Sequence, residues 1–288
     1  MKIKIRTFLQ AIFFIGLFGF TSNKESPPHL GIVYRLEQDS LIYVSGFSLI
    51  GESVSRMLSP SIPEEQFQQN ISRIKNARCK VFLCNIFFPG NIKIAGPDVN
   101  ESRVLSYADT VLCRAKSAGI VCIVLGSGGP RRIPDGYSRL KAQADFVILC
   151  KKLAVLADKH GVMIALESLQ SSETNFLNTV RSAAEVVRAV NHPRFRLNAD
   201  IFHMMREDES PQNIVDVADV LSHCEIAEKQ TRSMPGVQGD DFKPYLRALR
   251  KANYKGYIFI EANSANPAND IPLAFKYLTR QLQEVYAE

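Results

Sequence analysis

The sequence predicts a single (β/α)8 barrel of the TIM type, and three observations lead to this prediction. Short apolar runs of strand length alternate with longer amphipathic segments from residue 30 onward. The alternation occurs eight times, at a spacing of roughly 20 to 40 residues. No Gly-rich or Pro-rich linker separates the units, so one catalytic domain over residues 28–288 is expected.

Eight apolar runs are expected to form the strands. They are residues 30–34, 47–50, 80–84, 120–125, 162–166, 195–199, 223–227 and 256–260. Between them, apolar residues recur at three and four positions in 64–75, 137–159 and 182–190, which is the helical period. A doubly wound open sheet is the alternative, but a Gly-rich dinucleotide fingerprint does not follow the first run.

The N-terminus has the pattern of an export signal. Three cations, Lys2, Lys4 and Arg6, precede an apolar run of 13 residues, 8–20, which is too short to span a bilayer comfortably. We expect residues 1–21 to be a signal peptide and the protein to be exported, with the periplasm as its destination. An uncleaved membrane anchor is the alternative, and any membrane contact is expected through this segment alone.

Charge and cysteine content exclude some classes of protein. The net charge of +6 lies partly in the first six residues and is otherwise spread along the chain, so no nucleic-acid partner is expected. The six cysteines include no CxxC pair, which argues against a cysteine-rich zinc site and favours buried free thiols. The length and the apolar helices permit a homodimer without requiring one.

Acidic residues stand at the ends of four consecutive predicted strands. They are Glu167, Asp200, Glu225 and Glu261. The carboxyl ends of barrel strands meet at one mouth, where four carboxylates would repel one another unless a cation were bound. One divalent metal ion is therefore expected, with Mn²⁺ favoured and Mg²⁺, Co²⁺ or Zn²⁺ as alternatives. For each acid taken alone, capping of the following helix is the competing interpretation.

From about residue 30 to residue 285 the sequence resembles the xylose isomerase-like family of sugar phosphate isomerases and epimerases. The resemblance lies in the order of the acids and in residues 223–236, which are similar to the family pattern H-x-H-x-x-E...R-x-x-P-G. It implies that Glu167, Asp200, Glu225 and Glu261 are the metal ligands. Glu225 stands where the pattern has its second histidine, so the ligands would be carboxylates throughout if Glu225 binds the metal. The alternative is that Glu225 points elsewhere and the metal keeps a water at that position.

The resemblance extends to two loops, residues 85–97 and 126–136. It implies substrate contacts for five residues: Asn85, Arg131, Arg132, His203 and Arg232. The alternative for the second loop is a flexible connection with solvated arginines, and His203 could instead serve the core or a helix cap.

The resemblance also implies the chemistry: a metal-dependent isomerase or epimerase that removes a proton next to a carbonyl through a metal-bound enediolate. Glu167 and Glu261 would be the acid and base, and the partner would be a small carbohydrate. One alternative is a lyase that eliminates the β substituent of a keto-glycoside, and another is a non-catalytic exported sugar-binding barrel. The related abasic-site nucleases need more histidines than the five in this chain.

Overall fold

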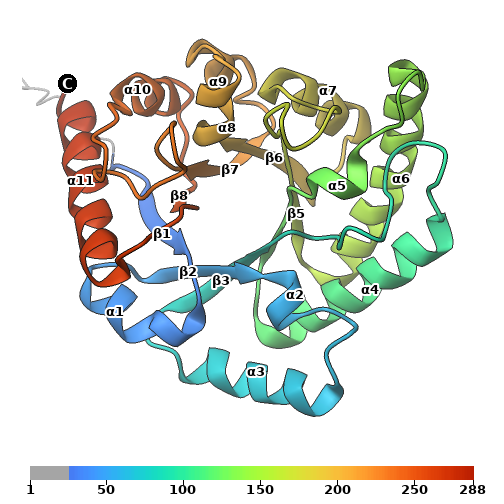
Figure 1. Ribbon diagram of the computed structural model, residues 1–288, viewed down its shortest axis with the longest axis horizontal. Helices are drawn as coiled ribbons and strands as arrows, with labels where there is room; N and C mark the ends of the chain where they lie inside the picture. The colour runs from blue at the N-terminus through green and yellow to red at the C-terminus, as the bar shows by residue number, and fades with distance from the viewer. Residues whose placement is uncertain (1–25) are drawn as a thin grey trace, which may run out of the picture.

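The computed structural model describes residues 26–288, and the predicted signal peptide lies outside the described residues. Eight strands form one closed barrel in chain order, and each strand is parallel to both neighbours (Figure 1). The strands are β1 (His29–Val33), β2 (Leu49–Ser53), β3 (Lys80–Asn85), β4 (Cys122–Leu125), β5 (Met163–Glu167), β6 (Phe195–Asp200), β7 (Leu221–Ile226) and β8 (Tyr257–Ile260). The predicted fold class is confirmed.

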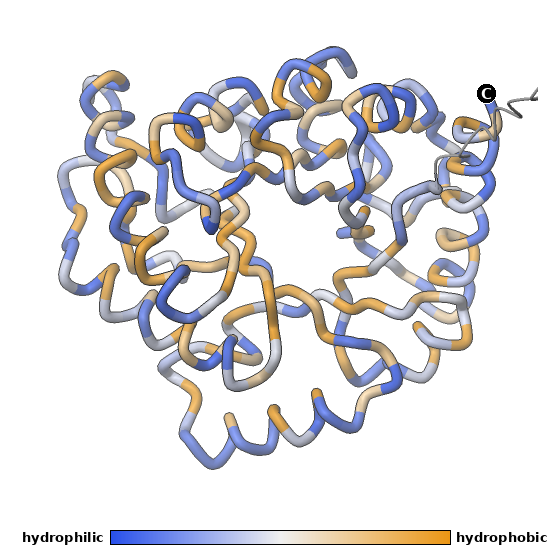
Figure 2. The backbone as a smooth tube through the Cα atoms, turned by 180° about the vertical axis from the view of Figure 1, so that it is seen from behind, coloured by the Kyte–Doolittle hydropathy of each residue, from blue (hydrophilic) through white to orange (hydrophobic). Residues whose placement is uncertain are grey.

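The helices lie outside the barrel, around the ring of strands (Figure 1). They are α1 (Asp39–Val44), α2 (Val54–Met57), α3 (Glu64–Asn76), α4 (Glu101–Ala118), α5 (Gly128–Arg131), α6 (Arg139–His160), α7 (Val180–Val190), α8 (Ile201–Arg206), α9 (Gln212–Asp216), α10 (Lys243–Lys251) and α11 (Pro267–Ala287), with a 3-10 turn at Leu36–Gln38. Figure 2 shows α3 as largely hydrophilic, with hydrophobic residues recurring along it. Of the hydrophobic residues of α3, Phe67 and Ile71 are buried and Ile74 is half-buried.

Local signals begin and end the long helices. The Asn100 side chain accepts a hydrogen bond from the Arg103 amide at the start of α4, and Ser138 does the same for the Lys141 amide at the start of α6. Gly119 and Gly161 end these helices with φ values of 74° and 71°, in the left-handed region that glycine adopts without strain.

The barrel interior is packed with apolar side chains below the mouth. Phe259 fills much of this space, together with Leu49, Leu83, Cys122, Val124 and Ala165. A Cβ atom on Gly31 would lie 2.5 Å from the Phe259 ring, so the absence of a side chain in β1 admits the ring. This apolar plug leaves the strand ends as the place for polar chemistry.

Two expectations need small corrections. Strand β2 begins and ends later than the apolar run at 47–50, because Gly51, Glu52 and Ser53 pair with β3 and hydropathy cannot show this. The cysteines are free, as expected, but Cys113 on α4 is exposed. Within residues 26–288, none of the helices is long and apolar enough to cross a membrane.

Candidate active site

Four carboxylates meet at the mouth of the barrel. Glu167, Asp200, Glu225 and Glu261 each offer one oxygen, and these oxygens lie within 4.8 Å of one another. Strand register produces the meeting, because Asp200 pairs with Glu225 across β6 and β7, and Glu167 pairs with Asn198 across β5 and β6. Sequence reasoning selected these four acids, and the structure brings them together.

Asp200 serves two purposes. Its Oδ1 atom accepts a hydrogen bond of 2.8 Å from the Phe202 amide and so caps α8. Its Oδ2 atom lies 3.4 Å from Arg232 Nη2 and 3.5 Å from His203 Nε2. The capping interpretation is therefore confirmed for Oδ1, while Oδ2 lies among the side chains of the site and its role as a metal ligand stays a prediction.

Glu225 is held in its charged form by three neighbouring side chains. Asn85 Nδ2 donates to its Oε1 over 2.9 Å, and Asn198 Nδ2 donates to its Oε2 over 2.5 Å. His223 Nε2 lies 3.6 Å from Oε1. Burial favours the protonated form, but His223 and the two amides together lower the pKa of Glu225 below its ordinary value.

Glu167 and Glu261 behave in the opposite way. Burial, followed by the charges of Glu225 and Asp200, raises the pKa of Glu167 well above its ordinary value. Burial also raises the pKa of Glu261 to about 7, although the nearby Arg232 guanidinium opposes the shift. Two of the four carboxyls thus resist ionisation, which is what crowding of like charges produces.

Unpaired oxygens in and around the cluster suit a bound cation. Among the described residues, three buried oxygens of the cluster have no hydrogen-bond partner: Glu167 Oε1, Asn85 Oδ1 and Asn198 Oδ1. A buried oxygen without a partner costs about 1–3 kcal/mol. A divalent ion bound by the carboxylates would remove this cost for Glu167 Oε1 and would also remove the repulsion, so the residues fit such an ion.

Two other buried acids at strand ends show the contrast. Glu52, in β2, accepts the Leu36 amide over 2.7 Å and the Arg56 guanidinium over 3.2 Å. Glu228, after β7, accepts backbone amides from Gly236, Gln238 and Gly239 over 2.7–2.8 Å, and the Ser233 hydroxyl as well. Both carboxylates are used by the structure itself, so neither is available to a ligand.

His203 and Arg232 add hydrogen-bond donors to the site. The Gln170 amide donates to His203 Nδ1 over 3.2 Å, which assigns the ring proton to Nε2, 3.4 Å from Glu167 Oε1. Burial lowers the pKa of His203, so the ring is neutral. Arg232 pairs with the Glu261 carboxylate and lies over the Phe202 ring. Both donors therefore face the carboxylates.

A cavity of about 350 Å³ opens beside the cluster, and its lining includes Asn85, Glu167, Glu173, His203, Arg232 and Glu261. Gly126, directly after β4, makes room for Glu167. A Cβ atom there would lie 1.8 Å from Glu167 Oε2. Glycine is thus required by the close approach of the carboxylate.

The two arginines of the β4 loop do not line this cavity. Arg131 is fully buried and donates from Nη1 to the backbone oxygen of Glu167 over 2.6 Å. The expected substrate contact is corrected for Arg131, because its guanidinium supports the end of β5 from behind. Arg132 is exposed, and its role stays a prediction.

Sequence reasoning missed Asn198, Glu173 and the role of Gly126. Asn198 stands two residues before Asp200 on β6, and residues two apart on a strand share a face, so the strand period could have revealed it. Glu173 lies in a loop after β5, and Gly126 acts through a contact with another strand. Local patterns carry no signal for either.

The fold and this carboxylate mouth define a class: a TIM barrel with one carboxylate-rich site at its C-terminal face. The model of the xylose isomerase-like TIM barrel family matches residues 46–281. The chain belongs to this family.

Similar proteins include a putative hydroxypyruvate isomerase of Danio rerio, 29% identical over 60% of this chain and 64% of the relative. A ketose 3-epimerase of Arthrobacter globiformis is 30% identical over 40% of each chain. The matches thus span less than two thirds of these relatives. The names of these relatives are those of isomerases and epimerases.

Solved structures share the fold over more of the chain. An L-ribulose 3-epimerase superposes with a TM-score of 0.78 at 18% identity, over 90% of this chain and 96% of that one. The 3-keto-D-glucoside 4-epimerase of E. coli superposes with a TM-score of 0.73 at 20% identity, over 89% of this chain and 99% of that one.

Proposed function

We propose that the protein is a divalent-metal-dependent sugar isomerase or epimerase that moves a proton on the carbon next to a carbonyl. The observation that carries the proposal is the cluster of four carboxylates. Within the described chain, one of its buried oxygens, Glu167 Oε1, has no hydrogen-bond partner. The names of the similar isomerases and epimerases support the same reaction class.

Glu167, Asp200, Glu225 and Glu261 would hold the metal. When bound, a divalent cation supplies Lewis acidity, which stabilises the negative charge that develops on two neighbouring sugar oxygens as the proton leaves. We favour Mn²⁺ because the ligands are oxygens, with Mg²⁺, Co²⁺ and Zn²⁺ as alternatives.

Glu167 and Glu261 are proposed as the proton-transfer pair. One carboxylate takes the proton from the carbon beside the carbonyl, and the electron pair moves to the carbonyl oxygen to form an enediolate. The other carboxyl returns a proton to the opposite face, which inverts the carbon and leaves the composition of the sugar unchanged.

His203 and Arg232 are proposed to bind the substrate. The Nε2 proton of His203 and the guanidinium of Arg232 would donate to sugar oxygens and hold the ring in one orientation. Asn85 would keep Glu225 and Glu261 in place, since its amide donates to both. The partner proposed for this site is a small carbohydrate.

Export to the periplasm and a homodimer stay predictions. Elimination from a keto-glycoside shares the enediolate and differs in its product, because the β substituent leaves with the electron pair. Analysis of the products separates it from epimerisation: the leaving group appears only in elimination.

The test is elemental analysis of the purified protein, of Glu261→Ala and of Glu185→Ala, an exposed acid on α7 that serves as the control. We expect about one metal equivalent in the wild type and the control, and a loss in Glu261→Ala. Metal-loaded protein is then screened with keto-sugars for exchange of the carbon-bound proton with deuterium from solvent. Failure to bind metal under any reconstitution would reject the proposal.

A further inference from the structure

A second cavity of about 570 Å³ lies beside the catalytic cavity at the same mouth. Ile86 and Pro89, in the loop after β3, line both cavities and form the wall between them. The rest of the lining comes from Asn91 and Ile92 in the same loop, from the segment after β2 and from α4. In a (β/α)8 barrel, such loops shape the part of the substrate that lies away from the reacting carbon.

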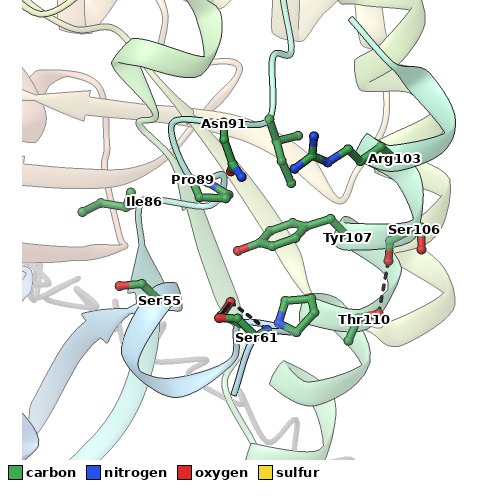
Figure 3. A pocket seen from close by; sticks show the side chains of 12 residues that line it. Ser55, Ser61, Ile86, Pro89, Asn91, Arg103, Ser106, Tyr107 and Thr110 are labelled. Atoms are coloured by element: carbon green, nitrogen blue, oxygen red, sulfur yellow. Dashed lines mark hydrogen bonds between the residues drawn. The ribbon is translucent and has the colours of Figure 1, made fainter. Parts of the chain in front are cut away.

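Helix α4 presents one stripe of side chains to this cavity. Arg103, Ser106, Tyr107 and Thr110 line it and stand at the three- and four-residue spacing of one helix face. Figure 3 shows the Tyr107 ring projecting into the middle of the cavity, with its hydroxyl directed toward Ser55 and Ile86. The ring lies against Phe88, with centroids 5.6 Å apart.

Two exposed polar side chains of the cavity are available to a ligand. In the part of the chain that the structure describes, the Arg103 guanidinium and the Asn91 amide have no hydrogen-bond or ion-pair partner. Figure 3 shows both above the Tyr107 ring. A mainly apolar cavity with an aromatic ring and a few free donors is typical of a small-molecule site.

The floor of the cavity is built and is not a gap in packing. Arg114 donates to the backbone oxygens of Ser59 and Ile62, and so fixes the segment between α2 and α3. The Ser59 and Ser61 hydroxyls form a hydrogen bond of 2.8 Å. The shape is therefore set before a ligand arrives, which lowers the entropic cost of binding.

Ile86 marks the boundary with backbone strain. Its φ is 59°, in the left-handed region that β-branched residues rarely adopt, and its side chain is half exposed. Strained positions of this kind cluster at ligand sites. A hydrophobic side chain held there at the rim of two cavities is placed to contact a ligand that crosses from one to the other.

We propose that the second cavity is a subsite for a ring joined to the keto-sugar, so that the substrate is a two-ring glycoside. The proposal rests on the proposed function, because the sugar ring that reacts would occupy the catalytic cavity. The attached ring would lie on Tyr107, with Arg103 and Asn91 donating to its oxygens. Sugar and aromatic aglycones share this chemistry, and the test distinguishes them.

The test uses metal-loaded protein and four probes built on a hexose that carries its ketone on a ring carbon other than the anomeric carbon. They are the free sugar, its methyl glycoside, its phenyl glycoside and a disaccharide in which its anomeric carbon is joined to a second sugar ring. Ser106→Trp would fill the cavity without touching the catalytic residues. Ser117→Trp, lower on the same face of α4 and outside the lining, is the matched control. Calorimetry measures affinity, deuterium exchange measures turnover, and equal melting temperatures show that both variants fold.

We expect the wild type and Ser117→Trp to bind a ring glycoside at least tenfold more tightly than the methyl glycoside, and Ser106→Trp to lose this preference. Arg103 is exposed, and if the attached ring is a sugar, Arg103→Gln should weaken binding of the disaccharide and leave binding of the phenyl glycoside unchanged. Equal affinities for methyl and ring glycosides in the wild type, or equal behaviour of both tryptophan variants, would overturn the subsite.

The readouts separate the two proposals. Tighter binding of ring glycosides without deuterium exchange would reject the proposed isomerase or epimerase and support the subsite. Deuterium exchange without tighter binding of ring glycosides would support the enzyme and reject the subsite. A protein that neither binds nor exchanges any of the probes loses both proposals.

Discussion

Gly126→Ala tests whether the position of Glu167 controls the site. The new Cβ atom would lie 1.8 Å from Glu167 Oε2 and 3.0 Å from its Cδ, and ordinary contact begins at 3.4 Å. The oxygen must therefore move by 3.4 − 1.8 = 1.6 Å. Glu167 is buried, and its backbone is held by Arg131, so little room exists for this movement.

Misplacement of a reacting group by about 1 Å can reduce the rate about 100-fold. We expect Gly126→Ala to lower kcat/KM by at least about 100-fold and to weaken metal binding. Overpacking should lower the free energy of unfolding by about 1–3 kcal/mol. The assays are deuterium exchange at the sugar carbon, metal titration and urea unfolding of the same preparations.

Gly129→Ala is the control, because within the described residues nothing lies within 4 Å of the position where its Cβ atom would stand. It adds the same methyl group to the same loop. Metal affinity and exchange in Gly126→Ala that equal those of Gly129→Ala would refute the role assigned to the close approach.

Three further predictions concern buried polar groups. The pKa of Glu261 is raised from 4.5 to about 7 in the folded, metal-free protein, so its contribution to stability is lost as the pH rises through this window. The unfolding free energy of Glu261→Gln, relative to that of the wild type, should thus rise between pH 5 and 8 by up to about 3 kcal/mol. Parallel pH profiles of the two proteins would contradict this. Glu228→Gln should cost about 1–3 kcal/mol in denaturant unfolding, because a neutral amide accepts the Gly236 and Gly239 amides less well; an unchanged midpoint would count against it. Asn198→Leu should weaken metal binding about tenfold in titration, since Glu225 loses the donor that orients it; wild-type affinity would show that the other donors suffice.

The sequence was sufficient for the barrel because its strands are buried on both faces and read as continuous apolar runs. The runs at 80–84, 162–166 and 195–199 each lie within one residue of the observed strand ends. The run at 47–50 was displaced, since Glu52 is polar yet buried by contacts with Leu36 and Arg56. Hydropathy is a property of each residue alone, whereas strand pairing depends on the segments that the residue contacts.

The site divides in the same way. The sequence alone determined which carboxylates end the strands, because a parallel barrel brings all its carboxyl ends to one face. Only the tertiary structure decided which acids remain available for a ligand: Glu228 is consumed by the backbone of its own loop, whereas Glu167 Oε1 has no hydrogen-bond partner among residues 26–288. It also decided that Arg131 lies behind the site and that Gly126 makes room for Glu167. These facts depend on contacts between segments far apart in the chain, and no local pattern of residues encodes such distances.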